Sequence, residues 1–145
     1  EVPKLRERAL DLALDNILFH DEIDPDQISD LYDQCIAGIV SLDPRHKSHN
    51  IPGKFLTYMQ NGLPVLANIN PGNDLGELIR EEQVGKVSEA NQINDLEEKF
   101  NSLLELVNID KDISTKCRAL FNKLFDVSNT THQITSALTN INKNR

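Results

Sequence analysis

Apolar positions along the chain fall into short continuous runs and longer stretches with helical spacing. The continuous runs predict four strands, at Ile17–Phe19, Ile36–Leu42, Pro64–Ile69 and Val84–Val87. The stretches around them carry apolar residues every three or four positions and predict four helices, at Lys4–Ala13, Pro25–Cys35, Pro52–Asn61 and Leu75–Gln83. Alternating strands and helices are typical of repeated βαβ units, so the pattern predicts an α/β fold with a parallel sheet.

Helix ends are marked by residues with known positional preferences. Pro25 and Pro52 suit first helical positions, and Gly62 suits the end of a helix. Asp74, with Glu77 three residues later, predicts a capping box. Each of these four sites favours a helix boundary close to the one that the apolar spacing predicts.

The C-terminal third has a different pattern, because no strand-like run follows Val87. Its apolar residues trace three helical stripes: Leu96, Phe100, Leu103, Leu104 and Val107; Ile113, Cys117, Leu120, Phe121 and Leu124; and Ile134, Leu138 and Ile141. We therefore expect a sheet region over residues 1–90 and a helical region over 91–142. Together they predict a truncated Rossmann-like sheet with a helical C-terminal third, in one partial domain over residues 1–145.

Composition narrows the function classes. With 39% hydrophobic and 26% charged residues in 145, the chain suits one globular domain, and its formal charge of −8 argues against a general nucleic-acid surface. Cys35 and Cys117 lie inside apolar patterns, which predicts buried thiols in a cytoplasmic protein. No run is long enough for a membrane span, no signal peptide opens the chain, and the missing initiating Met suggests a fragment. At Asn129 we expect a helix cap rather than a glycosylation site.

Acidic residues are unevenly distributed. Asp and Glu make up 23 of the 145 residues, yet none occurs from Pro44 to Asn73. The same stretch carries the basic residues Arg45, His46, Lys47, His49 and Lys54. This cationic island falls at a predicted strand-to-helix junction, where unpaired amides at a helix start favour anions. The sequence therefore predicts an anion site at Asn50–Lys54, with Gly53 allowing close approach and Lys54 supplying charge. An ordinary helix start with a solvated Lys54 is the alternative that the residues leave open.

Other polar clusters favour structural explanations. Asp24 and Asp26 could hold a divalent cation, but Asp24 before Pro25 is better explained as a helix cap. His20 lies beside acids on an extended segment, where neighbouring side chains point to opposite faces, so we expect a ligand or water contact rather than a general base. Because no third zinc ligand accompanies His46 and His49, we predict no metal site and assign no catalytic residue.

The stretch from residue 50 to 67 resembles a known donor-binding signature. It reads Asn50-Ile51-Pro52-Gly53-Lys54, then an apolar helix, then Gly62-Leu63-Pro64-Val65. This order looks like that of the retaining GT-B glycosyltransferases of the large family four. The resemblance covers nearly the whole chain, since residues 15–20, 28–42 and 75–87 are similar to neighbouring strands and helices of that family. Within it, the chain looks most like the N-acetyl-L-fucosamine transferases of O-antigen clusters.

The resemblance implies a function and a site. It implies transfer of a sugar from a UDP-sugar to a lipid-linked O-antigen acceptor, in the cytoplasm or at the inner membrane face, with no metal or other cofactor. By position, the amides of Gly53 and Lys54 would hold the diphosphate. The loop His49–Pro52, which includes Asn50 and Ile51, would face the sugar, and the loop around Ile23 would meet the base.

Two departures from the family pattern bear on this expectation. The family's paired glutamates fall at His49 and Thr57 here, so imidazole and hydroxyl contacts would replace carboxylate contacts. The chain also begins after the family's second sheet strand, which implies that the acceptor-binding N-terminal domain is absent. We therefore expect this fragment to bind a donor without catalysing transfer, with peripheral membrane contact made through the missing domain.

Two other classes fit parts of the pattern. A sugar-nucleotide 2-epimerase of the same architecture would use a similar diphosphate site. A receiver-like α/β signalling module, which is not an enzyme, would use the acids of His20–Asp24. The second alternative also requires a lysine at a later strand end, and none follows in the required order.

Overall fold

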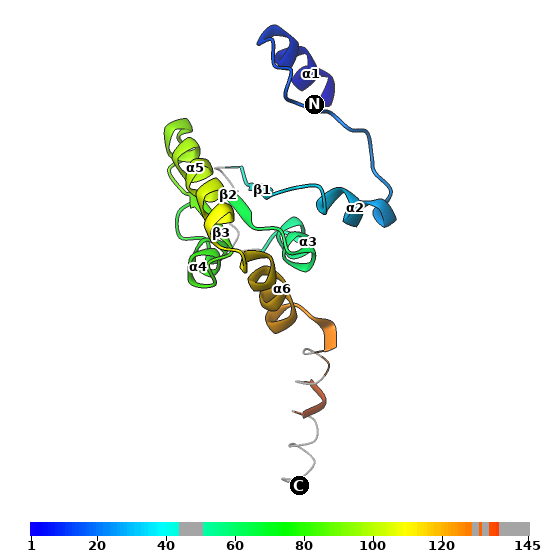
Figure 1. The fold of residues 1–145 in the computed structure, drawn as a ribbon, viewed down its shortest axis with the longest axis vertical. Coiled ribbons are helices and arrows are strands. Elements are labelled where there is room, and N and C mark those ends of the chain that lie inside the picture. The colour runs from blue at the N-terminus through cyan, green and yellow to red at the C-terminus, as the bar shows by residue number, and fades with distance from the viewer. Residues whose placement is uncertain (44–50, 129–130, 132–133, 137–145) are drawn as a thin grey trace. The chain divides into compact units, whose positions relative to one another are not determined.

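The computed structural model describes residues 1–43, 51–128, 131 and 134–136. Within these residues it contains three parallel strands, six α-helices and one short 3-10 helix (Figure 1). The elements, in chain order, are α1 (Val2–Asp11), η1 (Pro25–Gln27), α2 (Ile28–Tyr32), β1 (Gly38–Ser41), α3 (Gly53–Asn61), β2 (Val65–Asn68), α4 (Asp74–Glu81), β3 (Gly85–Ser88), α5 (Ile93–Ile109) and α6 (Ile113–Leu124). The predicted α/β class with an open parallel sheet is confirmed.

The chain divides into two compact units, Glu1–Leu31 and Tyr32–Arg145. In the first unit, α1 is held to the following segment mainly through Arg6. Its guanidinium donates to the Phe19 carbonyl at 3.3 Å, lies 5.9 Å from the centre of the Phe19 ring and is 3.6 Å from an Asp21 carboxylate oxygen. These contacts are largely exposed, so each adds little to stability.

The predicted first strand is wrong. Residues 17–19 form no strand, and Leu18 is 81% exposed. Three apolar residues satisfy the pattern, but a strand also needs a neighbour to accept its backbone hydrogen bonds. The described sheet therefore has three strands in the order β1-β2-β3, not four.

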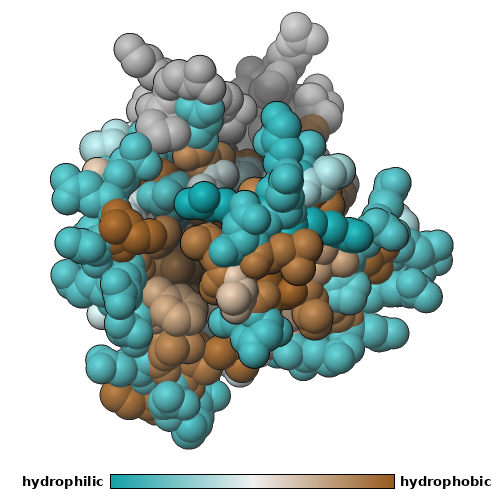
Figure 2. Space-filling model, turned by 90° about the horizontal axis from the view of Figure 1, so that it is seen from above, coloured by the Kyte–Doolittle hydropathy of each residue, from teal (hydrophilic) through white to brown (hydrophobic). Residues whose placement is uncertain are grey.

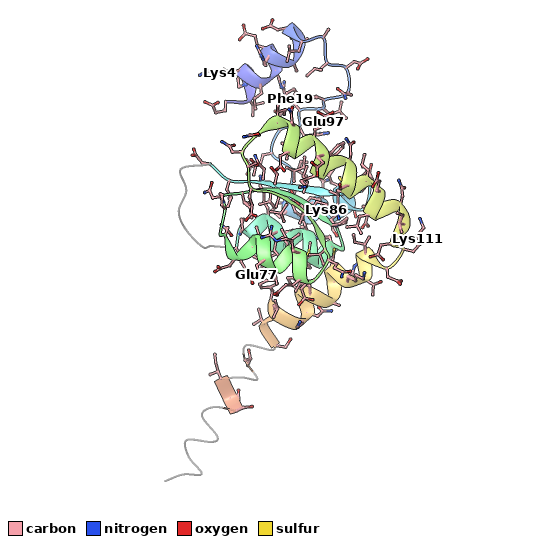
Figure 3. The ribbon with its side chains drawn as sticks, turned by 90° about the vertical axis from the view of Figure 1, so that its left-hand side faces the viewer. Lys4, Phe19, Glu77, Lys86, Glu97 and Lys111 are labelled. Carbon is pink, nitrogen blue, oxygen red and sulfur yellow. The ribbon has the colours of Figure 1, made fainter. Side chains whose placement is uncertain are left out.

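The second unit is built around that sheet. Gly38 pairs with Val65 and Val65 with Gly85, and the register continues to the strand ends. Apolar side chains on one sheet face pack with α3, α4 and α6 in a single core, which contains Val40, Phe55, Met59, Val65, Ala67, Ile69, Leu75, Ile79, Val84, Val87, Ile113, Cys117 and Leu120. Figure 3 shows α5 on the opposite face, where Leu66 and Leu103 are also buried. The sheet is therefore covered by helices on both faces.

Helix boundaries follow the predicted signals with small corrections. Gly62 ends α3 in the left-handed conformation, at φ 77°, as predicted. The α4 cap is Asn73, whose side chain accepts from the Leu75 amide, so the predicted capping box at Asp74 is wrong by one position. Pro52 is the cap of α3 rather than its first residue. The helix predicted over Pro25–Cys35 ends at Tyr32 and begins as a 3-10 turn.

The helical C-terminal region is confirmed for the first two stripes, which form α5 and α6. The third stripe and Asn129 lie wholly or largely outside the described residues. Of the two cysteines, Cys117 is buried as predicted, whereas Cys35 is exposed because it follows the end of α2 instead of lying on its inner face. No described helix combines the length and apolar character needed to cross a membrane.

Large apolar side chains also remain at the surface. Figure 2 shows brown apolar residues among teal polar ones on the face that it draws. Ile39, on the edge strand β1, is 59% exposed, and Ile93 and Ile109, at the two ends of α5, are 75% and 80% exposed. The second unit thus buries a compact core while leaving apolar positions open on β1 and α5.

Candidate functional site

The predicted anion site lies at the start of α3. Because α3 connects two parallel strands, its first turn lies at the end of the sheet where β1 finishes. The cap residue is Pro52, at φ −65° and ψ 141°, and it makes no side-chain capping bond. Its carbonyl accepts from the Phe55 amide at 2.9 Å. Within the part of the chain that the structure describes, no side chain caps the first turn of α3, in contrast to α4, which Asn73 caps.

The two residues after Pro52 are open to approach. Gly53 and Lys54 are exposed, and a Cβ placed on Gly53 would meet no atom within 4 Å. Packing therefore does not require glycine at position 53. A helix start with an exposed glycine and a lysine can present its amides and an ammonium group to an anion.

The hydroxyl of Thr57, one turn further along, is hydrogen-bonded within α3. Its hydroxyl donates to the Gly53 carbonyl at 3.0 Å. A threonine that bonds to the preceding turn has its hydroxyl proton in use, although its oxygen can still accept a hydrogen bond. Thr57 thus lies near the helix start, as the sequence predicted, but its hydroxyl is turned toward the backbone.

The core holds α3 firmly in place. Phe55 and Met59 are completely buried, and the Phe55 ring meets Phe125 edge to face at 6.3 Å. On the flank, the Tyr58 hydroxyl donates to the Ile39 carbonyl at 3.4 Å. Burial, followed by the neighbouring Tyr32, raises the pKa of Tyr58 above its ordinary value. The helix start is therefore carried on a rigid element rather than on a free loop.

Polar residues line the adjacent strand ends. Ser41, Asn68 and Ser88 end the three strands in register with one another. Beyond them, the Asn70 amide donates to the Asp43 carbonyl at 3.3 Å and joins the loops that follow β1 and β2. Ser88 is fully buried, and its hydroxyl has no hydrogen-bond partner within the part of the chain that the structure describes. The strand ends thus form a polar edge beside α3.

An acidic groove beside Ile51 and α4 was not predicted. A cavity of about 340 Å³ is lined by Ile51, Asp74, Glu77, Leu78, Glu81, Leu124 and Phe125. Its three carboxylates come from one face of α4, at spacings of three and four residues, so helical periodicity could have revealed them. They disfavour an anion beside Ile51, and any diphosphate at this helix start would have to lie toward Gly53 and Lys54.

The other predicted residues are divided between two regions. Ile51, Pro52, Gly53, Lys54 and Thr57 lie together on one continuous segment. Ile23 belongs to the unit Glu1–Leu31, whereas that segment belongs to the unit Tyr32–Arg145. His49 and Asn50 fall outside the described residues, as do the other basic residues at 45–47.

The alternative metal sites receive no support. Asp24 accepts from the Asp26 amide at 3.0 Å and caps η1, as the structural explanation predicted. Among the described residues, no group of three or more His, Cys, Asp or Glu side chains is placed to hold a metal ion. In the comparisons with known proteins, no family model, no curated protein and no solved structure matches the chain.

Proposed function

We propose that the chain is the donor-binding part of a glycosyltransferase and that the start of α3 receives the diphosphate of a UDP-sugar. One observation carries the proposal: among the described residues no side chain caps the start of α3, which lies at the end of a parallel strand with Gly53 and Lys54 exposed. Ligands of open α/β sheets bind outside the carboxyl ends of the strands. The resemblance of residues 50–67 to the family-four donor signature supplies the choice of ligand.

The proposed site would act on the leaving group. Transfer breaks the bond between the sugar's anomeric carbon and a diphosphate oxygen, while the acceptor hydroxyl forms the new bond and loses its proton. Negative charge therefore grows on the departing UDP. Amides at Gly53 and Lys54 and the Lys54 ammonium would stabilise that charge, which is often a large part of catalysis. The acceptor would be lipid-linked, and its site would belong to a second domain.

Titration of the ¹⁵N-labelled chain with UDP tests the binding step. We expect saturable amide shifts at Gly53, Lys54 and Phe55, and much weaker binding of uridine, which lacks the diphosphate. Lys54→Gln should weaken UDP binding by about tenfold, the size of a charge-assisted hydrogen bond. Lys111→Gln is the matched control, because Lys111 is an exposed lysine between α5 and α6 whose ammonium donates to the Asn108 carbonyl.

A second substitution separates binding from folding. Gly53→Ala adds a methyl group where nothing lies within 4 Å, so the fold should tolerate it. The same methyl group would crowd a diphosphate bound to the helix amides, so UDP binding should weaken. Unchanged affinity in both Gly53→Ala and Lys54→Gln would exclude this helix start as the diphosphate site. In the intact enzyme, Lys54→Ala should lower turnover far more than stability.

A further inference from the structure

A second cavity lies beside β3, away from the start of α3. It has a volume of about 360 Å³ and is lined by Arg80, Gln83, Gly85, Lys86, Val87, Lys99, Ser102 and Leu106. These residues come from the end of α4, the turn after it, β3 and the middle of α5. Gln83 and Gly85 lie at the amino end of β3, whereas α3 begins after the carboxyl end of β1. Its volume is within the lower part of the range for small-molecule sites, about 300–1,000 Å³.

The charged residues that line this cavity are all cationic, in an acidic chain. Its lining includes three cationic side chains and no carboxylate, in a protein with a formal charge of −8. Such a concentration of one charge in a concave site raises the local concentration of ions of the other sign. The lining therefore favours an anionic ligand.

Lys86 is the central cation. It is half-buried on β3, between Gly85 and Val87, and it forms no ion pair with any residue that the structure describes. Figure 3 labels it on the sheet, beneath α5. A partly buried ammonium group without a carboxylate partner has lost part of its hydration. A bound anion would compensate for that loss.

The other two cations have partners that they can share or exchange. Arg80 lies 3.0 Å from Glu89, which is 27% exposed. Lys99 lies 2.7 Å from Glu98, which is 69% exposed, and 4.0 Å from Asp95. Ion pairs that water still reaches contribute little stability, so a more highly charged ligand can share these cations with their carboxylates at little cost. Arg80 and Lys99 are therefore available to a ligand that carries more than one charge.

Neutral donors complete the lining. The carbonyls of Val84 and Ser88 accept from β2, and alternate residues of a parallel strand bond in opposite directions. The amides of Gly85 and Val87 consequently face the edge of β3 that has no neighbouring strand in the described sheet. Ser102 adds a hydroxyl and Gln83 an amide, while Val87 and Leu106 supply apolar surface.

We propose that this cavity binds a small phosphorylated molecule, with Lys86, Lys99 and Arg80 around its phosphate group. A phosphate carries up to two charges and three acceptor oxygens, which suits several convergent donors better than a single carboxylate does. The remaining volume and the Val87 and Leu106 surface would take a sugar-sized body. This site is separate from the diphosphate site proposed above and does not depend on it.

NMR titration with glucose 6-phosphate, inorganic phosphate and glucose tests the site. We expect saturable shifts at Gly85, Val87 and Ser102 with both phosphates, tighter binding of glucose 6-phosphate, and no response to glucose. Lys86→Gln should weaken glucose 6-phosphate binding at least tenfold and Ser102→Asp should abolish it. The control Lys111→Gln should leave it unchanged.

Three results would overturn the proposal. Shifts that do not saturate, or that appear only at Gly53 and Lys54, would place the anion elsewhere. Equal affinity in the wild type and Lys86→Gln would remove the central cation from the site. Circular dichroism of each variant establishes that it is folded, and Lys86→Arg, which keeps the charge, should retain binding where Lys86→Gln loses it.

Discussion

The buried thiol of Cys117 predicts a specific alkaline instability. Cys117 lies in the core on α6 with no exposed surface, and burial raises the pKa of its thiol from 9.0 to about 12. The unfolded chain therefore loses this proton at a lower pH than the folded chain does. The stabilising contribution of the protonated thiol is fully present below about pH 9 and is lost as the pH rises toward 12. The limiting slope for one proton is about 1.4 kcal/mol per pH unit.

Between about pH 8 and about pH 10.5 this linkage amounts to a loss of about 2 kcal/mol in the free energy of unfolding. Urea denaturation followed by circular dichroism, in the presence of a phosphine reductant, measures that loss. Cys117→Ala and Cys117→Val remove the titrating group while keeping an apolar side chain, so their curves should fall less steeply with pH. Other groups, including Tyr58, titrate equally in all three proteins and cancel in the comparison. Parallel curves for the wild type and both variants would refute the reasoning.

Three further predictions concern particular positions. Gly85→Ala should destabilise the second unit by at least about 2 kcal/mol in urea denaturation, since its Cβ would lie 2.1 Å from the Val65 carbonyl oxygen; wild-type stability would contradict this. Asn73→Ala should cost about 1 kcal/mol by the same assay, because Asn73 caps α4 through the Leu75 amide at 3.0 Å, whereas Asn73→Asp should retain most of the stability. Ellman's reagent should react quickly with exposed Cys35 and with the buried thiol only after denaturation, so two fast thiols in the native protein would contradict the described burial.

Most strands, helices and helix ends of the second unit were predictable from local rules. The apolar runs at β1, β2 and β3 and the helical stripes of α3 to α6 follow from side-chain periodicity, which is a property of the backbone itself. Gly62 and Pro25 marked helix ends because their own conformational limits decide where they fit. The same local logic placed the exposed Gly53 and Lys54 at a helix start.

Long-range packing decided the rest. Whether residues 17–19 become a strand depends on a neighbouring strand, and whether Cys35 is buried depends on where α2 ends, so neither was readable from apolar pattern alone. The cavity beside β3 joins residues 80–87 to residues 99–106, and the groove beside Ile51 joins α4 to α6. The sequence by itself thus determined the kinds of elements and the position of the helix start that we propose as the diphosphate site. The tertiary structure alone decided which charges gather around a cavity, because that depends on distances between segments that periodicity does not encode.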